Sequence, residues 1–76
     1  MIKYWDNQIS INPDEAFNYL SRGESYALLG QWETAIKDYD EAIRLDPEDS
    51  ESRRQRGRAY VEVDKPYKAN EDYRRC

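Results

Sequence analysis

The apolar residues of this chain fall into blocks in which they recur every three or four positions. That spacing is typical of helices with one apolar face. Gly30 lies just past one block and Pro47 just past another, and both residue types commonly follow the end of a helix. The pattern therefore predicts an all-α fold of about five helices, over residues 2–11, 14–29, 33–45, 48–63 and 66–76.

The sequence also repeats itself with a 34-residue period. Five residues recur in one register without a gap: Pro13 as Pro47, Gly23 as Gly57, Tyr26 as Tyr60, Ala35 as Ala69 and Tyr39 as Tyr73. A self-match at a fixed period indicates copies of one structural unit that stack to bury a shared core. We expect one domain, 1–76, with the second helix of a partial repeat over 1–15, a complete repeat over 16–49 and a nearly complete, truncated repeat over 50–76.

This two-helix unit resembles the tetratricopeptide repeat (TPR), on the residues Tyr19, Gly23, Tyr26, Gly30, Trp32, Ala35, Tyr39, Ala42 and Pro47. The resemblance implies a short α-solenoid of antiparallel helix pairs with a right-handed superhelix. It also implies a non-catalytic module that binds a peptide or partner helix in a groove lined by the first helix of each repeat. The groove positions are Phe17, Leu20, Ser21, Glu24, Ala27 and Leu28 in one copy, and Glu51, Arg54, Gln55, Arg58, Val61 and Glu62 in the next.

The chemistry of these groove positions favours an acidic ligand. Arg54 and Arg58 stand one helical turn apart, and guanidinium groups bind carboxylates through paired hydrogen bonds. An acidic peptide or the C-terminus of a partner protein is one expectation. In the alternative interpretation, Arg58 pairs with Glu62 or Glu24 and Arg54 is solvated. Chaperone-binding TPR domains use a lysine and asparagine clamp, whereas this protein has Leu20, Glu24 and Gln55 at those places, which argues against a heat-shock-chaperone tail.

Two arginines stand where the TPR family commonly has leucine. Arg22 is followed sixteen residues later by Asp38, and Arg56 is followed at the same spacing by Asp72. An unpaired charge at a core-facing position is costly. We therefore predict the ion pairs Arg22–Asp38 and Arg56–Asp72, each bridging the two helices of one unit.

The composition argues against catalysis. The chain has no histidine, which is the commonest general base and metal ligand, and its one cysteine is the last residue. We expect no enzyme activity, no cofactor and no metal site. No apolar run is long enough to cross a bilayer, so we expect no membrane partner and a soluble, cytoplasmic protein.

The charges are unevenly distributed along the sequence. Residues 1–49 carry four Lys or Arg against eleven Asp or Glu, and residues 50–76 carry eight against five. This asymmetry favours head-to-tail contacts, so the alternative function is a self-assembling repeat segment that forms homo-oligomers through its uncapped terminal helices. The net charge of -4 argues against a nucleic-acid partner.

Overall fold

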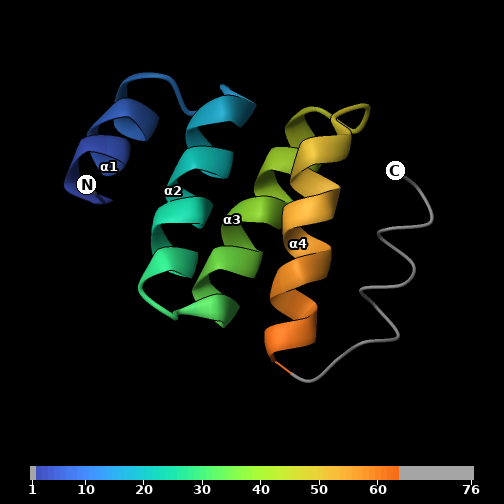
Figure 1. The fold of residues 1–76 in the computed structure, drawn as a ribbon. Helices are drawn as coiled ribbons and strands as arrows, with labels where there is room; N and C mark the ends of the chain where they lie inside the picture. Colours follow the sequence, from blue (N-terminus) through green and yellow to red (C-terminus); the bar gives the residue numbers. More distant parts are fainter. Residues whose placement is uncertain (1, 64–76) are drawn as a thin grey trace.

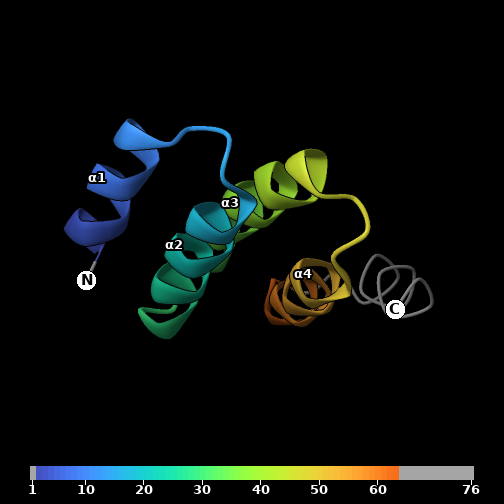
Figure 2. The same ribbon diagram turned by 90° about the horizontal axis from the view of Figure 1, so that it is seen from above.

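The computed structural model describes residues 2–63 as four α-helices joined by short turns (Figure 1). Successive helices run in opposite directions, and α1 and α3 lie in one layer while α2 and α4 lie in the other (Figure 2). The all-helical prediction is confirmed, and the fifth predicted helix falls on residues that lie outside the described range. The four helices are α1 (Ile2–Ile11), α2 (Ala16–Leu28), α3 (Trp32–Leu45) and α4 (Ser50–Glu62).

The core forms where α2 and α4 meet α3. Its fully buried side chains are small except for Tyr39, and they include Ala35, Ala42 and Ala59. Gly23 of α2 lies against Tyr39, since a Cβ on this glycine would stand 2.6 Å from Cε1 of the tyrosine ring. The missing side chain at Gly23 therefore lets α2 and α3 approach closely while one large ring fills the space between them.

Two of the helices, α2 and α4, begin two residues later than the sequence pattern predicts. We expected Glu15 and Asp49 inside the first turns, but each stands just before its helix in extended backbone as the N-cap residue. The Asp49 carboxylate accepts hydrogen bonds from the Glu51 backbone N–H at 3.1 Å and from the Ser52 hydroxyl at 3.0 Å. An acidic side chain satisfies the unpaired N–H groups of a helix from this position, which explains the shift.

Removing the cap of α4 should weaken the fold measurably. We expect Asp49→Ala to lower the free energy of unfolding by about 1 kcal/mol, since α4 loses its cap and the buried Ser52 hydroxyl loses its acceptor. Urea unfolding followed by circular dichroism measures the change. Glu48→Ala is the control, because it removes the adjacent, exposed carboxylate. Equal effects of the two substitutions would contradict the capping role.

Arg22 links three helices. Its Nε and Nη2 donate hydrogen bonds to the Asp38 carboxylate on α3 at 2.9 and 2.7 Å, and its Nη1 donates to Asp6 on α1 at 2.9 Å. The side chain of Asp38 is 7% exposed, against 50% for Asp6. The hydrogen bonds to Asp38 raise the pKa of Arg22 above its ordinary value, although burial opposes them. The pair expected from the sequence is present, and Asp6 is an additional partner.

Arg56 on α4 also forms an ion pair with an aspartate of the helix before it. Its Nη1 donates to Asp40 on α3 at 2.7 Å, and Asp40 stands one repeat period after Asp6. Each arginine thus binds the aspartate sixteen residues before it. The expected partner of Arg56, Asp72, lies outside the described residues. Ion pairs therefore connect α1 to α2, α2 to α3 and α3 to α4.

Candidate functional site

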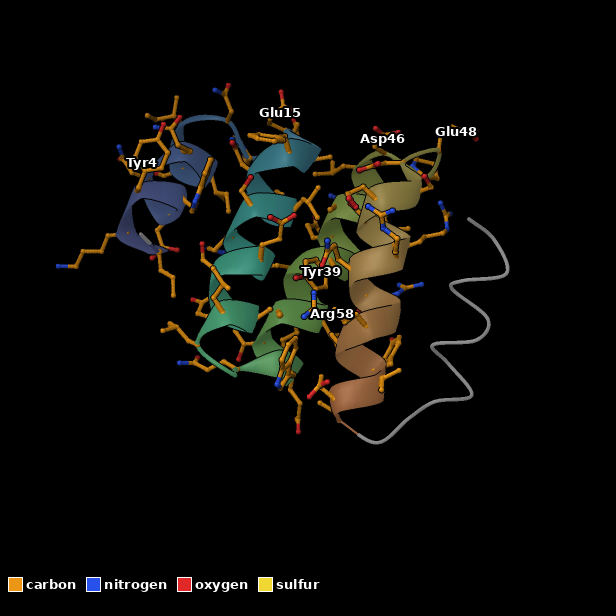
Figure 3. All side chains as sticks on the ribbon, viewed as in Figure 1. Tyr4, Glu15, Tyr39, Asp46, Glu48 and Arg58 are labelled. Atoms are coloured by element: carbon orange, nitrogen blue, oxygen red, sulfur yellow. The ribbon has the colours of Figure 1, made fainter. Side chains whose placement is uncertain are left out.

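A cleft of about 400 Å³ opens between α2 and α4, with α3 behind it. It forms because α4 packs mainly on α3 and barely touches α2. Figure 3 shows Tyr39 and Arg58 in the region between these helices. The cleft is lined by Glu24, Ala27 and Leu28 of α2, Trp32 and Tyr39 of α3, and Gln55 and Arg58 of α4.

The apolar part of the cleft is open to solvent. The side chain of Leu28 is exposed, and the whole residue retains 78% of its accessible surface. Trp32 and Ala27 lie beside it on the cleft wall and are half-buried. Exposed apolar surface rimmed by polar groups is a common property of interaction sites.

The polar part of the cleft carries one charge on each wall. Glu24 of α2 and Arg58 of α4 both line it, and Gln55 adds a neutral amide. Burial, and secondarily the charge of Glu51, raises the pKa of Glu24. Burial and the Glu24 charge also raise the pKa of Tyr39, while Arg58 acts in the opposite direction. The Tyr39 phenol therefore keeps its proton at physiological pH and can donate a hydrogen bond.

The structure brings together only some of the groove residues expected from the sequence. Glu24, Leu28, Gln55 and Arg58 share the cleft, together with Ala27. The remaining expected positions do not line this cleft: Phe17, Leu20, Ser21, Glu51, Arg54, Val61 and Glu62. Trp32 and Tyr39 line it although the sequence interpretation did not assign them to a groove.

Several of the residues outside the cleft have other surroundings. Leu20 is buried in the core, and Phe17 stacks edge-on with Trp5 of α1 at 5.9 Å between ring centroids. The Ser21 carbonyl accepts a hydrogen bond from the Ser25 hydroxyl. Glu62 lies near the turn between α2 and α3, beside Gly30.

The two groove arginines have different surroundings. Arg54 forms an ion pair with Glu51, one turn away on the same helix. Arg58 forms no hydrogen bond or ion pair with any other residue of the described range, and this includes Glu24 and Glu62. Arg58 is therefore the groove arginine whose guanidinium is available to a ligand.

Across residues 2–63, no three His, Cys, Asp or Glu side chains gather in a way that could hold a metal ion. None of the described helices has the length and apolar character needed to cross a membrane.

Stacked antiparallel helices with a cleft between alternate helices define a helical-repeat protein. A family model of the TPR repeat matches residues 23–64, which is more than half of the chain. The chain therefore belongs to the TPR family, whose members are typically non-catalytic interaction modules.

Among solved structures, the chain is similar to the second TPR of Spaghetti (RPAP3), which is bound to the HSP90 peptide SRMEEVD. The TM-score is 0.95 at 27% sequence identity, and the match covers 97% of this chain and 68% of that one. A comparison with curated protein sequences gives no match.

Proposed function

We propose that this protein is a non-catalytic interaction module that binds a peptide segment of a partner protein in the cleft between α2 and α4. One observation carries the proposal: exposed Leu28 and the available Arg58 guanidinium line the same cleft. An apolar contact and a charged anchor are what a cleft needs to hold and orient a short peptide. The peptide bound to the similar TPR of Spaghetti supports this class of ligand.

An acidic side chain of the ligand would meet Arg58. The guanidinium can donate two parallel hydrogen bonds to one carboxylate, which gives orientation as well as affinity. The lysine and asparagine clamp of chaperone-binding relatives has no counterpart, since Leu20 is buried in the core and Glu24 and Gln55 hold the other places. The proposed ligand is therefore an internal peptide segment with an acidic residue rather than a heat-shock-chaperone tail.

Peptides selected from a display library provide the test. The sequence has two tryptophans, so Trp5→Phe leaves Trp32 as the reporter, and its fluorescence should change when a peptide fills the cleft. We expect Arg58→Ala to weaken binding by about tenfold or more, because a charge-assisted hydrogen bond contributes roughly 1.5–3 kcal/mol.

The matched control is Arg44→Ala, which removes an arginine that pairs with Glu41 on α3 and does not line the cleft. We expect this variant to bind with unchanged affinity. Selected peptides that bind equally well to the Arg58 variant and leave Trp32 fluorescence unaltered would contradict the proposal.

A further inference from the structure

The cleft presents a negative and a positive side chain from opposite walls. Glu24 comes from α2 and Arg58 from α4, and Tyr39 behind them responds to the charge of both. Within the described range, neither side chain forms a hydrogen bond or an ion pair with a neighbouring residue. The two charges are thus near each other without neutralising each other by direct contact.

Other arginines of residues 2–63 contrast with Arg58. Arg22, Arg44, Arg54 and Arg56 each bind at least one carboxylate, and Arg53 donates to the Pro47 carbonyl oxygen. Within residues 2–63, the other five arginines therefore have a hydrogen-bond or ion-pair partner, whereas Arg58 in the cleft does not.

The surroundings of Glu24 disfavour a ligand whose charges are all negative. Glu24 is exposed, but its place in the cleft still costs its carboxylate some hydration, and Glu51 of α4, itself paired with Arg54, adds a lesser repulsion. An acidic group bound at Arg58 would gain attraction there but would meet the field of Glu24, whereas the charge of Glu51 is paired with Arg54. A cation beside Glu24 would lower the cost of keeping that carboxylate charged. These charges therefore favour a ligand with a positive group on the α2 side of the cleft and a negative group on the α4 side.

We propose that the cleft recognises a mixed-charge peptide segment: a Lys or Arg that meets Glu24, an Asp or Glu that meets Arg58, and an apolar side chain between them that covers Leu28 and Trp32. In an extended peptide, alternate side chains point to the same face, so the three residues would stand at every second position. The inference rests on the proposed function for the place of binding and adds the charge pattern of the partner.

Six synthetic heptapeptides test the pattern. All have the form Ala-X-Ala-Leu-Ala-Z-Ala with blocked ends, and X and Z are Lys and Glu, Glu and Lys, Glu and Glu, Lys and Lys, Gln and Glu, or Lys and Gln. Titration against the Trp5→Phe protein, followed by Trp32 fluorescence, measures the affinities. We expect one of the two mixed-charge peptides to bind about tenfold more tightly than the all-acidic and all-basic ones.

Two variants assign the charges to their walls. Glu24→Gln should remove the advantage of Lys over Gln in the peptide and leave the advantage of Glu over Gln intact. Arg58→Gln should do the reverse. Circular dichroism confirms that each variant is folded, and Arg44→Ala, outside the cleft, should reproduce the parent affinities.

The outcomes separate the two proposals. All-acidic peptides that bind as tightly as mixed-charge ones, with Leu28→Ala still weakening both, would overturn the charge pattern and keep the peptide-binding cleft. Mixed-charge peptides that bind regardless of Glu24→Gln would also overturn the pattern. A complete lack of binding by all six peptides, or binding that is indifferent to Leu28→Ala, would overturn the pattern; if display-selected peptides also fail to engage the cleft, the proposed function fails with it.

Discussion

Asp38→Ala is expected to lower the free energy of unfolding by roughly 2–3 kcal/mol. The Asp38 side chain is 7% exposed and receives two hydrogen bonds from Arg22, so its removal leaves a partly buried guanidinium without its main partner. Breaking a fully buried ion pair costs about 3–5 kcal/mol, and the value is smaller here because the Arg22 side chain remains 23% exposed. A domain of this size has only about 3–5 kcal/mol of net stability, so this one change should remove much of it.

Loss of the other partner of Arg22 is the control for Asp38→Ala. Asp6→Ala removes the second partner of Arg22. The Asp6 side chain is 50% exposed, and exposed ion pairs contribute only about 0–1 kcal/mol to the free energy of unfolding. Urea unfolding of the parent and of both variants, with an osmolyte added to all three to keep them folded at zero urea, gives the comparison. Equal losses from the two substitutions would show that burial does not set the strength of this network.

Gly23→Ala is expected to destabilise the fold by about 1–2 kcal/mol net, although alanine is the better helix former. The new Cβ would stand 2.6 and 2.8 Å from two Tyr39 ring atoms and 3.2 Å from the Ala35 carbonyl oxygen. Overpacking of this kind forces side chains and backbone to move, and its cost exceeds the roughly 1 kcal/mol that alanine gains over glycine in a helix.

A double substitution identifies the cause. In a Tyr39→Leu background the ring is absent, so Gly23→Ala should cost less than about 1 kcal/mol or stabilise the helix. Thermal unfolding followed by circular dichroism measures both steps. A cost that stays the same after Tyr39→Leu would place the strain at the Ala35 carbonyl instead.

The sequence predicts the fold well because the period carries most of the information. Gly23 and Tyr39 both recur one period later, and their contact in the structure explains why both are needed in one unit. The helix starts were less accurate, since Asp49 serves equally as a first-turn residue or as a cap, and only the backbone conformation distinguishes the two.

The sequence predicts only one of the two partners of Arg22. The sixteen-residue spacing predicts the pair of Arg22 with Asp38, and the structure adds Asp6, which stands at the same distance on the other side of Arg22. The repeat contained that information, because Asp6 and Asp40 are one period apart and each binds the arginine that follows it.

The sequence predicts part of the cleft, because the polar residues that line it stand at groove positions. Tyr39, which also lines it, does not stand at a groove position. Tyr39 is a core residue, and whether such a ring also lines an open surface depends on how far α4 stands from α2. Helical spacing likewise places Arg54 beside Arg58. It does not show that Glu51 pairs with Arg54, while Arg58 stays available to a ligand. Such pairing depends on rotamers, and a sequence pattern does not define them.

The spacing of the arginine network has a consequence for how such a protein can grow. Asp38 and Asp40 share α3, where the first binds the arginine before it and the second binds the arginine after it. The repeat over residues 16–49 thus carries one arginine, one aspartate that binds this arginine and a second aspartate that binds the arginine of the next repeat. Tandem duplication of residues 16–49 would place Asp40 of one copy sixteen residues before the new Arg22 and Asp38 sixteen residues after it. The new guanidinium would then have both acidic partners without a compensating substitution, so gene duplication of this unit can lengthen the array one repeat at a time.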